Sequence, residues 1–252
     1  MTEIDRLSSL LRDARCAVAF TGAGMSTESG ISDFRSPGGV WSRHQPVYFE
    51  DFVTSRAARI RYWQQRRALH GEFSGAHPNA GHLALARLEV QGLLRSVITQ
   101  NIDGLHQDAG STAVIEIHGT ARIIACIACG KEWSPEAVDQ RLDAGEDAPD
   151  CDECGAPLKS KTISFGQAMP EREMTAAAAL ADESDLFLSI GSSLVVEPAA
   201  SLPRVAKESG ATLVIINREP TPLDPLATLV IREPIGEVLS GVVRHLGCED
   251  VA

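Results

Sequence analysis

The stretch TGAGMSTESGISDFR, residues 21–35, follows the apolar run CAVAF at residues 16–20. A glycine-rich turn after a buried strand lets the backbone approach a phosphate group, and the N-terminus of a following helix favours anions. The spacing of Gly22, Gly24 and Gly30 departs from the common dinucleotide pattern G-x-G-x-x-G, and no G-K-[ST] follows as in a P-loop. We therefore expect an unusual nucleotide-binding loop. The alternative is a structural strand-to-helix turn with surface charges.

The end of this stretch adds an aromatic side chain between opposite charges, in the order Asp33, Phe34 and Arg35. An aromatic ring beside a carboxylate and a guanidinium group suits a planar ring and its ribose better than it suits a plain turn. Ser26 adds a hydroxyl donor nearer the glycines. These residue types support the nucleotide-binding interpretation of the loop.

Short apolar, β-branched runs alternate with helical patterns along the chain. The runs cover residues 16–20, 96–101, 113–119, 186–191, 212–217 and 227–232. The helical patterns cover residues 3–14, 80–91, 171–182, 198–209 and 236–246. This alternation predicts an α/β fold, a Rossmann-like parallel sheet with helices on both faces.

Two stretches break the alternation, and we interpret them as insertions. Residues 37–79 carry helical segments rich in Arg and Gln, and residues 121–162 carry two cysteine pairs. Together they are expected to form a small zinc-ribbon and helical module. The Rossmann-like domain would consist of residues 1–36, 80–120 and 163–252.

In a doubly wound sheet the ligand lies beyond the carboxyl ends of the strands. The predicted strands lead into the polar or glycine-rich stretches 21–24, 99–103, 118–120, 191–193 and residue 217. Gln100, Asn101 and Asp103 would offer directed hydrogen-bonding groups, although Asp103 could instead cap a helix. His118 could exchange protons near pH 7, although a lone histidine at a strand end is more often a structural group.

The spacing C-x2-C-x21-C-x2-C, formed by Cys126, Cys129, Cys151 and Cys154, predicts a zinc site. Four thiolates close a tetrahedral coordination sphere and leave no position for an activated water, so the predicted role is structural. A redox pair is the alternative, but it would not need the second CxxC.

Composition narrows the class of protein. The chain has 252 residues and a formal net charge of −11, which disfavours direct binding of nucleic acid and would suit a basic partner. No apolar run approaches the roughly 18 residues that span a bilayer, and the charged N-terminus is typical of an amphipathic helix rather than a signal peptide. We therefore expect a cytoplasmic protein without membrane association.

The motifs GAGMSTESGISDFRS, TQNIDGLH, IHGT, both CxxC pairs, FG at residues 165–166, GSSLVVEPAA and IIN together resemble the sirtuins. Sirtuins are NAD-dependent protein-lysine deacylases. Each motif is weak alone, but the ordered set runs from about residue 16 to residue 243 and is specific. The resemblance covers nearly the whole chain and implies a bacterial-type, single catalytic core.

The resemblance implies NAD as co-substrate and one structural Zn²⁺ ion held by the four cysteines. The residues implied to bind NAD are Gly22, Ala23, Gly24, Ser26, Asp33, Phe34, Arg35, Trp41, Gln100, Asn101, Ile102, Asp103, His118, Gly191, Ser192, Ser193, Asn217 and Ile235. His118, as general base, and Asn101 are the implied catalytic residues. By the same resemblance, the substrate is an acyl-lysine protein or peptide that binds as an added strand. Its implied contacts are Ile163, Phe165, Gly166, Val195 and Val196.

The resemblance also implies the chemistry. Nicotinamide leaves as the acyl oxygen attacks the ribose, His118 then activates a ribose hydroxyl, and the products are free lysine and O-acyl-ADP-ribose. Relatives that prefer succinyl or malonyl groups carry a Tyr and, three residues later, an Arg. Aligning this chain on Arg66 puts Trp63 at the tyrosine position, so we favour acetyl and other neutral acyl groups.

Other functions stay open from the sequence. A desuccinylase or demalonylase, or a longer-chain deacylase, would use the same fold with another acyl group. A mono-ADP-ribosyltransferase or NAD hydrolase would use the pocket without acyl-lysine, and a sensor or scaffold would bind NAD without turnover. We expect a monomer, and the sequence does not identify the protein substrate.

Overall fold

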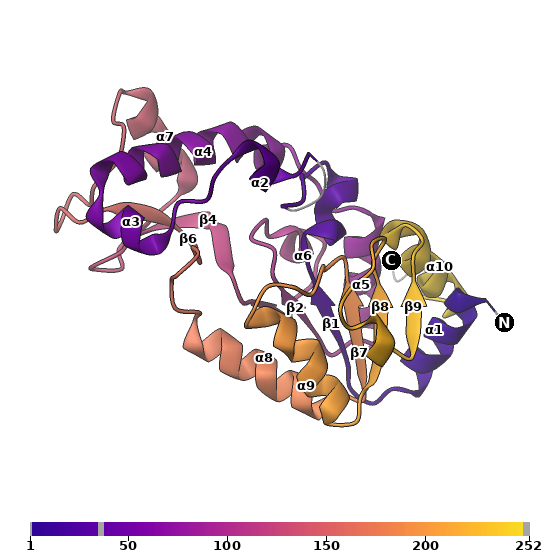
Figure 1. Ribbon diagram of the computed structural model, residues 1–252. Helices are drawn as coiled ribbons and strands as arrows, with labels where there is room; N and C mark the ends of the chain where they lie inside the picture. The colour runs from indigo at the N-terminus through magenta and orange to yellow at the C-terminus, as the bar shows by residue number, and fades with distance from the viewer. Residues whose placement is uncertain (1, 35–37, 249–252) are drawn as a thin grey trace.

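The computed structural model describes residues 2–34 and 38–248 (Figure 1). Its larger sheet has six parallel strands in the order β3-β2-β1-β7-β8-β9. These strands are β1 (Ala17–Thr21), β2 (Ser96–Thr99), β3 (Val114–Glu116), β7 (Leu186–Ile190), β8 (Thr212–Ile216) and β9 (Leu229–Ile231). The strand order reverses between β1 and β7, which is where ligands bind in sheets of this class. The predicted Rossmann-like sheet is confirmed.

Helices cover both faces of this sheet. One face carries α1 (Glu3–Asp13), α5 (Ala80–Val90) and α10 (Ile235–His245), whose apolar side chains share one core with the sheet. The other face carries α8 (Glu171–Glu183) and α9 (Leu202–Glu208), the latter preceded by the 3-10 turn η2 (Ala199–Ser201). β1, β2 and β7 are buried along their whole length, because helices cover the sheet on both sides.

The two insertions pack together at one end of the molecule (Figure 1). The first contains α2 (Val40–Arg43), α3 (Phe49–Thr54) and α4 (Arg56–Ser74). The second contains α7 (Pro135–Asp143) and an antiparallel sheet of β4 (Gly119–Cys126), β5 (Glu132–Trp133) and β6 (Leu158–Thr162). Trp63 of α4 is buried with Ile124 of β4, Val138 of α7 and Leu158 of β6, so both insertions share one small core.

Three short elements complete the described chain: η1 (Ala23–Ser29), α6 (Leu105–Asp108) and η3 (Asp224–Leu226). η1 and α6 follow β1 and β2, at the edge of the sheet where a ligand is expected. None of the helices in the described part of the chain has both the length and the hydropathy that crossing a membrane requires.

Candidate active site

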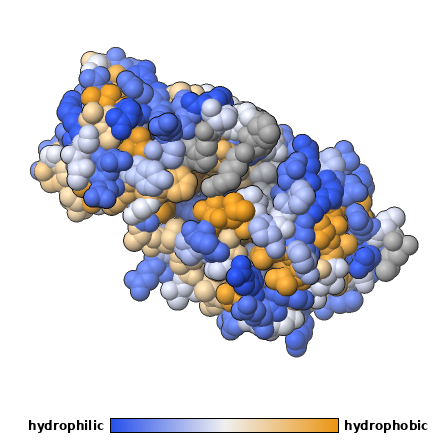
Figure 2. Space-filling view, in the orientation of Figure 1, coloured by the Kyte–Doolittle hydropathy of each residue, from blue (hydrophilic) through white to orange (hydrophobic). Residues whose placement is uncertain are grey.

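A cavity of about 1490 Å³ lies between the large sheet and the small module. Its walls come from the loops after β1, β2, β7 and β8 and from side chains of α4, α7 and β6. Figure 2 shows an apolar patch where the two parts meet, with hydrophilic residues beside it. The cavity therefore occupies the position at which the strand order reverses, as the sequence predicts.

Most of the predicted site residues line this cavity. From the predicted NAD set these are Gly22, Ala23, Gly24, Asp33, Phe34, Gln100, Asn101, Ile102, Asp103, His118, Gly191, Ser192, Ser193 and Asn217. From the predicted substrate set these are Ile163, Phe165, Gly166 and Val196.

The remaining predicted residues are placed differently. Ser26 is 1% exposed and lies behind the lining, and Ile235 is 9% exposed in the core beneath α10. Val195 is 53% exposed, outside the cavity lining that the structure describes. Trp41 belongs to α2, and Arg35 lies outside the described residues.

The glycines of the first loop allow a close approach between two strand ends. A β-carbon at Gly22 would lie 2.8 Å from the carbonyl oxygen of Gly191, and one at Gly24 would lie 2.9 Å from the Gly191 Cα. The Gly24 N–H donates to the same carbonyl oxygen at 2.9 Å. Larger side chains here would push the ends of β1 and β7 apart where the cavity begins, so we expect both glycines to be required for the site's shape.

A hydrogen-bonded set of side chains joins the loop after β1 to the loop after β2. Asn101, 6% exposed, donates from Nδ2 to the Gly22 carbonyl and to Ser26 Oγ, both at 3.0 Å. Ser26 Oγ then donates to Asp103 Oδ2 at 2.7 Å, while Asp103 Oδ1 accepts the Leu105 N–H at 2.9 Å. Asp103 thus both joins this set and holds the start of α6, so the two sequence hypotheses for it are compatible.

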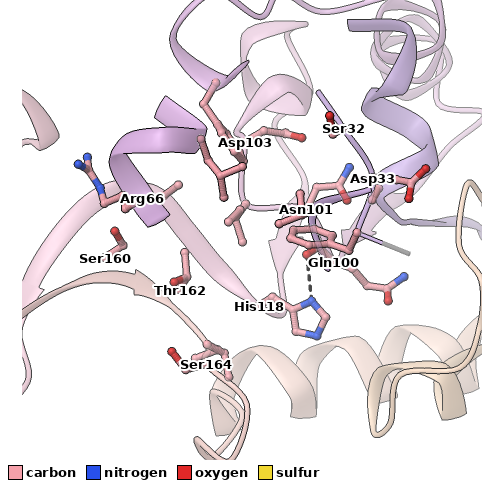
Figure 3. Close-up of a pocket in the computed structure, with 18 of the residues that line it drawn as sticks. Ser32, Asp33, Arg66, Gln100, Asn101, Asp103, His118, Ser160, Thr162 and Ser164 are labelled. Atoms are coloured by element: carbon pink, nitrogen blue, oxygen red, sulfur yellow. Dashed lines mark hydrogen bonds between the residues drawn. The ribbon is translucent and has the colours of Figure 1, made fainter. Parts of the chain in front are cut away.

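His118 is held in one tautomer by the main chain. Its Nδ1 lies 2.9 Å from the Gln100 carbonyl oxygen (Figure 3). A carbonyl can only accept, so Nδ1 carries the proton and Nε2 keeps its lone pair. The Ile163 N–H donates to the His118 carbonyl at 2.9 Å, which ties His118 to the end of β6. His118 therefore presents a base to the cavity between the predicted NAD and peptide loops.

The far end of the cavity contains a residue that the sequence argument missed. Glu219 lines the cavity beside Asn217. The Asn217 Nδ2 donates to the Glu219 carbonyl at 2.7 Å, and Arg232 Nη1 donates to the carbonyls of both residues at 2.7 and 2.8 Å. An acidic residue just after a strand could have been noticed, because such residues hold ribose hydroxyls in other dinucleotide-binding folds.

The side chains that α4 presents to the cavity differ from those expected from the alignment on Arg66. Tyr62 and Arg66, one turn apart on α4, line the cavity, while Trp63 is 1% exposed in the small core. Residues three and four positions apart both share a helix face. The Arg66 guanidinium therefore lies over the Trp63 ring, 5.4 Å from its centroid, but only Tyr62 lines the cavity together with Arg66. Arg66 donates to Asp139 of α7 at 2.5 and 3.4 Å, and Tyr62 Oη accepts the Ser160 N–H at 3.2 Å.

The four cysteines fit a zinc ion. Their sulfur atoms all lie within 4.8 Å of one another, with Cys126 Sγ 3.4 Å from Cys154 Sγ and Cys129 Sγ 3.7 Å from Cys151 Sγ. Tetrahedral thiolates about 2.3 Å from Zn²⁺ are about 3.8 Å apart, close to these spacings. The cluster lies at the tips of the β4–β6 sheet and adds nothing to the described lining of the cavity, which suits a structural ion.

Comparison with known proteins identifies the family. The Sir2 family model matches residues 22–198, from the first glycine of the loop to Pro198. The chain belongs to the Sir2 family. The resemblance drawn from the motifs is thereby confirmed.

Individual Sir2-family relatives are similar over the full chain. The NAD-dependent protein deacetylase 1 of Bradyrhizobium diazoefficiens is 51% identical over 244 residues, 96% of each chain. A Sir2 variant solved with a deacetylated p53 peptide and 3'-O-acetyl ADP-ribose has a TM-score of 0.92 at 37% identity and covers 98% of this chain and 99% of its own. A Sir2 structure with a p53 peptide and NAD+ has a TM-score of 0.90 at 38% identity, with the same coverage.

Proposed function

We propose that this Sir2-family protein removes acyl groups, above all acetyl groups, from protein lysines, using NAD as co-substrate. Nicotinamide and O-acyl-ADP-ribose are the other products. The observation that carries the proposal is His118, whose Nε2 faces a cavity shared by the glycine loop and the 163–166 loop. The relatives named as NAD-dependent deacetylases, and the Sir2 structures with NAD or an acetylated product, support it.

The chain's residues have distinct roles in this proposal. NAD would supply the acyl acceptor: nicotinamide is the leaving group when the acyl oxygen attacks the ribose, and the acyl group passes from the lysine nitrogen to a ribose hydroxyl only afterwards, with one water consumed as free lysine departs. His118 Nε2 takes the proton from a ribose hydroxyl, and the Gln100 carbonyl keeps Nδ1 protonated and the ring oriented. Asn101, with Asp103, would hold the nicotinamide-side ribose, and the N–H groups of the glycine loop would hold pyrophosphate. The adenosine half of NAD would be held by Gly191, Ser192, Ser193 and Asn217.

The acyl-lysine would enter as an added strand. The expected strand would lie between two loops, one with Ile163, Phe165 and Gly166 and the other with Val195 and Val196. Strand addition takes its affinity from main-chain hydrogen bonds, so low sequence selectivity is expected. The 163–166 loop is itself held in place, because the Phe165 carbonyl accepts the Phe49 N–H at 2.9 Å and the Ser164 carbonyl accepts the Gln167 N–H at 3.0 Å.

We favour neutral acyl groups over succinyl or malonyl. The cation that could recognise a carboxylated acyl chain, Arg66, is already paired with Asp139, so an acyl carboxylate would have to displace that partner. A longer neutral chain stays the second candidate, because Leu69 and Phe73 of α4 add apolar lining to the same cavity. Mono-ADP-ribosyl transfer is the third, and it would not need the 163–166 loop.

The other proposals concern organisation. The division into a domain of residues 1–36, 80–120 and 163–252 and an inserted module of 37–79 and 121–162 stays a proposal, supported by the small core that both insertions share. One Zn²⁺ would stabilise that module. A cytoplasmic monomer without nucleic-acid partners is proposed from the acidic charge and from paired cysteines suited to a reducing compartment.

The test is mass spectrometry of the purified protein with NAD and acetyl-, crotonyl-, myristoyl- and succinyl-lysine peptides. We expect peptide deacylation with matching O-acyl-ADP-ribose, ranked in favour of acetyl. His118→Ala should abolish both, whereas His245→Ala, at the end of α10 and 42% exposed, should not. Nicotinamide release without deacylation would overturn the proposal in favour of ADP-ribosyl transfer or NAD hydrolysis.

A further inference from the structure

Two buried histidines lie directly behind the cavity and take no part in the chemistry proposed above. His82 of α5 is 0% exposed and His106 of α6 is 1% exposed, and their rings meet edge to face with centroids 4.8 Å apart. Burial lowers the pKa of His82 to about 4 and that of His106 to about 3. Both rings are therefore neutral near pH 7, and each has one donor and one acceptor nitrogen.

His106 begins a chain of hydrogen bonds that ends at the main chain of Asn101. Its Nε2 lies 2.9 Å from Thr21 Oγ1, which donates to Thr99 Oγ1 at 2.8 Å. Because the Thr21 hydroxyl proton is used on Thr99, His106 Nε2 is the donor to Thr21. Thr99 Oγ1 also accepts the Asn101 N–H at 3.0 Å. All four residues are at most 6% exposed, so water does not compete for these bonds.

The hydrogen-bonded chain holds residues 99–101, and this segment contains two groups that shape the active site. Gln100, between Thr99 and Asn101, supplies the carbonyl that fixes the His118 tautomer. Asn101 supplies the amide that joins Gly22 to Ser26. A shift of this three-residue segment would therefore move the base and the nicotinamide side of the site together.

His82 ties the same assembly to the loop after β1. Its Nδ1 accepts the Asn79 N–H at 3.3 Å, and Asn79 Nδ2 donates to the Met25 carbonyl at 2.8 Å and to Ser29 Oγ at 3.0 Å. His82 Nε2 and His106 Nδ1 have no hydrogen-bond partner among the residues that the structure describes. Given the partners above, the first is a donor and the second an acceptor, on two touching rings. Buried polar atoms of this kind are rare enough to call for a reason beyond packing.

We propose that His106, braced by His82, is a positioning residue that fixes Gln100 and Asn101 through the hydroxyls of Thr21 and Thr99. It touches neither NAD nor substrate. It acts on the reaction by holding the carbonyl that orients His118 and the amide that organises the loop after β1. The proposal rests on the proposed deacetylation, because its readout is turnover of acetyl-lysine peptide.

The experiment is a double-mutant cycle of His106→Leu and Thr21→Val, with kcat and KM measured for NAD and acetyl-lysine peptide. Thr21→Val removes the hydroxyl and keeps the shape, so it tests the chain even if His106→Leu folds poorly. We expect each single variant to lower kcat at least about tenfold with KM for peptide within about twofold, and the double variant to lose no more than the worse single. His106→Gln, whose amide can still donate to Thr21, should recover most of kcat.

A buried core variant separates this role from simple destabilisation. Leu11→Ala, in the core beneath α1 and 0% exposed, should lower the Tm while kcat of the folded fraction stays at the wild-type value. Wild-type kcat in His106→Leu or Thr21→Val, or losses that multiply in the double variant, would overturn the proposal. An inactive wild-type protein would refute the proposed deacetylation instead, so the two failures are distinguishable.

Discussion

A histidine acts as a general base near neutral pH only if one ring nitrogen is free of a proton, and its neighbours decide which one. The Gln100 carbonyl makes that choice for His118. His82 and His106 are held in fixed tautomers too, but in a buried setting where only the neutral form is tolerated. His118 is thus a base that faces the cavity, whereas His82 and His106 are neutral, buried hydrogen-bonding groups behind it.

The buried pair predicts how stability depends on pH. An unfolded histidine titrates near pH 6.5, whereas burial lowers the pKa of His82 to about 4 and of His106 to about 3. Between these values the unfolded chain binds more protons than the folded one, so the free energy of unfolding falls as pH drops below about 6.5. The slope is at most about 1.4 kcal/mol per pH unit for each histidine. Urea unfolding from pH 7.5 to 5 measures it.

The control for this prediction is His106→Leu. This variant should lose the contribution of His106 to the pH dependence of the free energy of unfolding, while the contribution of His82 remains. Asp103 lies near His82 and raises its pKa, so His82 should titrate first as pH falls. A free energy of unfolding that stays flat from pH 6.5 to 5 in the wild-type protein would contradict the prediction.

At the scale of elements, the junction of β4 with β6 positions His118 from the other side. Gly119, the first residue of β4, has φ +70°, and a β-carbon there would overlap the carbonyl oxygen of Lys161 on β6. Gly119→Ala should therefore separate the strands, destabilise the fold by about 2–4 kcal/mol and displace His118. We expect lower Tm and kcat together. Gly92→Ala, with φ +71° but no atom within 4 Å, is the matched control and should cost stability with little loss of kcat.

The elements that could be predicted from sequence are those whose own pattern decides their structure. The strands of the large sheet are mostly apolar, above all β1, β2 and β7, which helices cover on both faces, and each predicted run contains the core of one strand. β6 gave no such pattern, because its sequence is LKSKT. Lys159 is nevertheless 3% exposed: its ammonium group donates to the carbonyls of Ser160 and Thr162, and burial lowers its pKa to about 8.

Among the site residues too, those marked by a local sequence motif could be predicted, and those placed by tertiary packing could not. Gly22, Asn101 and His118 could be predicted, because a short motif at a strand end carries their chemistry. Trp63 and Tyr62 could not be assigned by alignment on Arg66, since only the packing of α4 on β6 decides which side chain faces the cavity. The ion pair between Arg66 and Asp139 joins segments 73 residues apart and has no local pattern at all.

The four-cysteine cluster is expected to hold the small module together through its zinc ion. Metal removal should unfold β4, β5, β6 and α7 locally, because a structural Zn²⁺ supplies about 10–16 kcal/mol of binding energy to small modules. Chelation, or Cys129→Ser, should release one zinc per chain and raise hydrogen exchange in this module more than in β1, β7 and β8. Activity should fall as well, since the 163–166 loop continues directly from β6. Cys16→Ser, outside the cluster, should keep the zinc. Full activity of a zinc-free protein would contradict this prediction.

At the scale of the whole molecule, the acidic balance of the chain is repeated in the described lining of the cavity, where carboxylates outnumber guanidinium groups. The formal net charge is −11. Among the described residues the cavity lining includes the carboxylates Asp33, Asp103, Asp108, Glu136, Asp139, Asp143, Glu197 and Glu219, against the guanidinium groups of Arg66 and Arg122. A cleft in which one sign of charge predominates attracts ligands of the opposite sign, and salt screens that attraction over about 8 Å at physiological ionic strength.

Acetyl-lysine peptides with arginine on both sides of the modified lysine should therefore have a lower KM than peptides with glutamate there, by about tenfold at low salt. The ratio should shrink towards one in 0.5 M NaCl, where the Debye length is about 4 Å, and kcat should change little. Glu197→Gln, which removes a charge beside the substrate loop at Val196, should lower the ratio at low salt, with glutamine-flanked peptides as the neutral reference. If the KM ratio were the same at low and high salt, the acidic lining would have no part in choosing substrates, and main-chain pairing alone would determine the affinity.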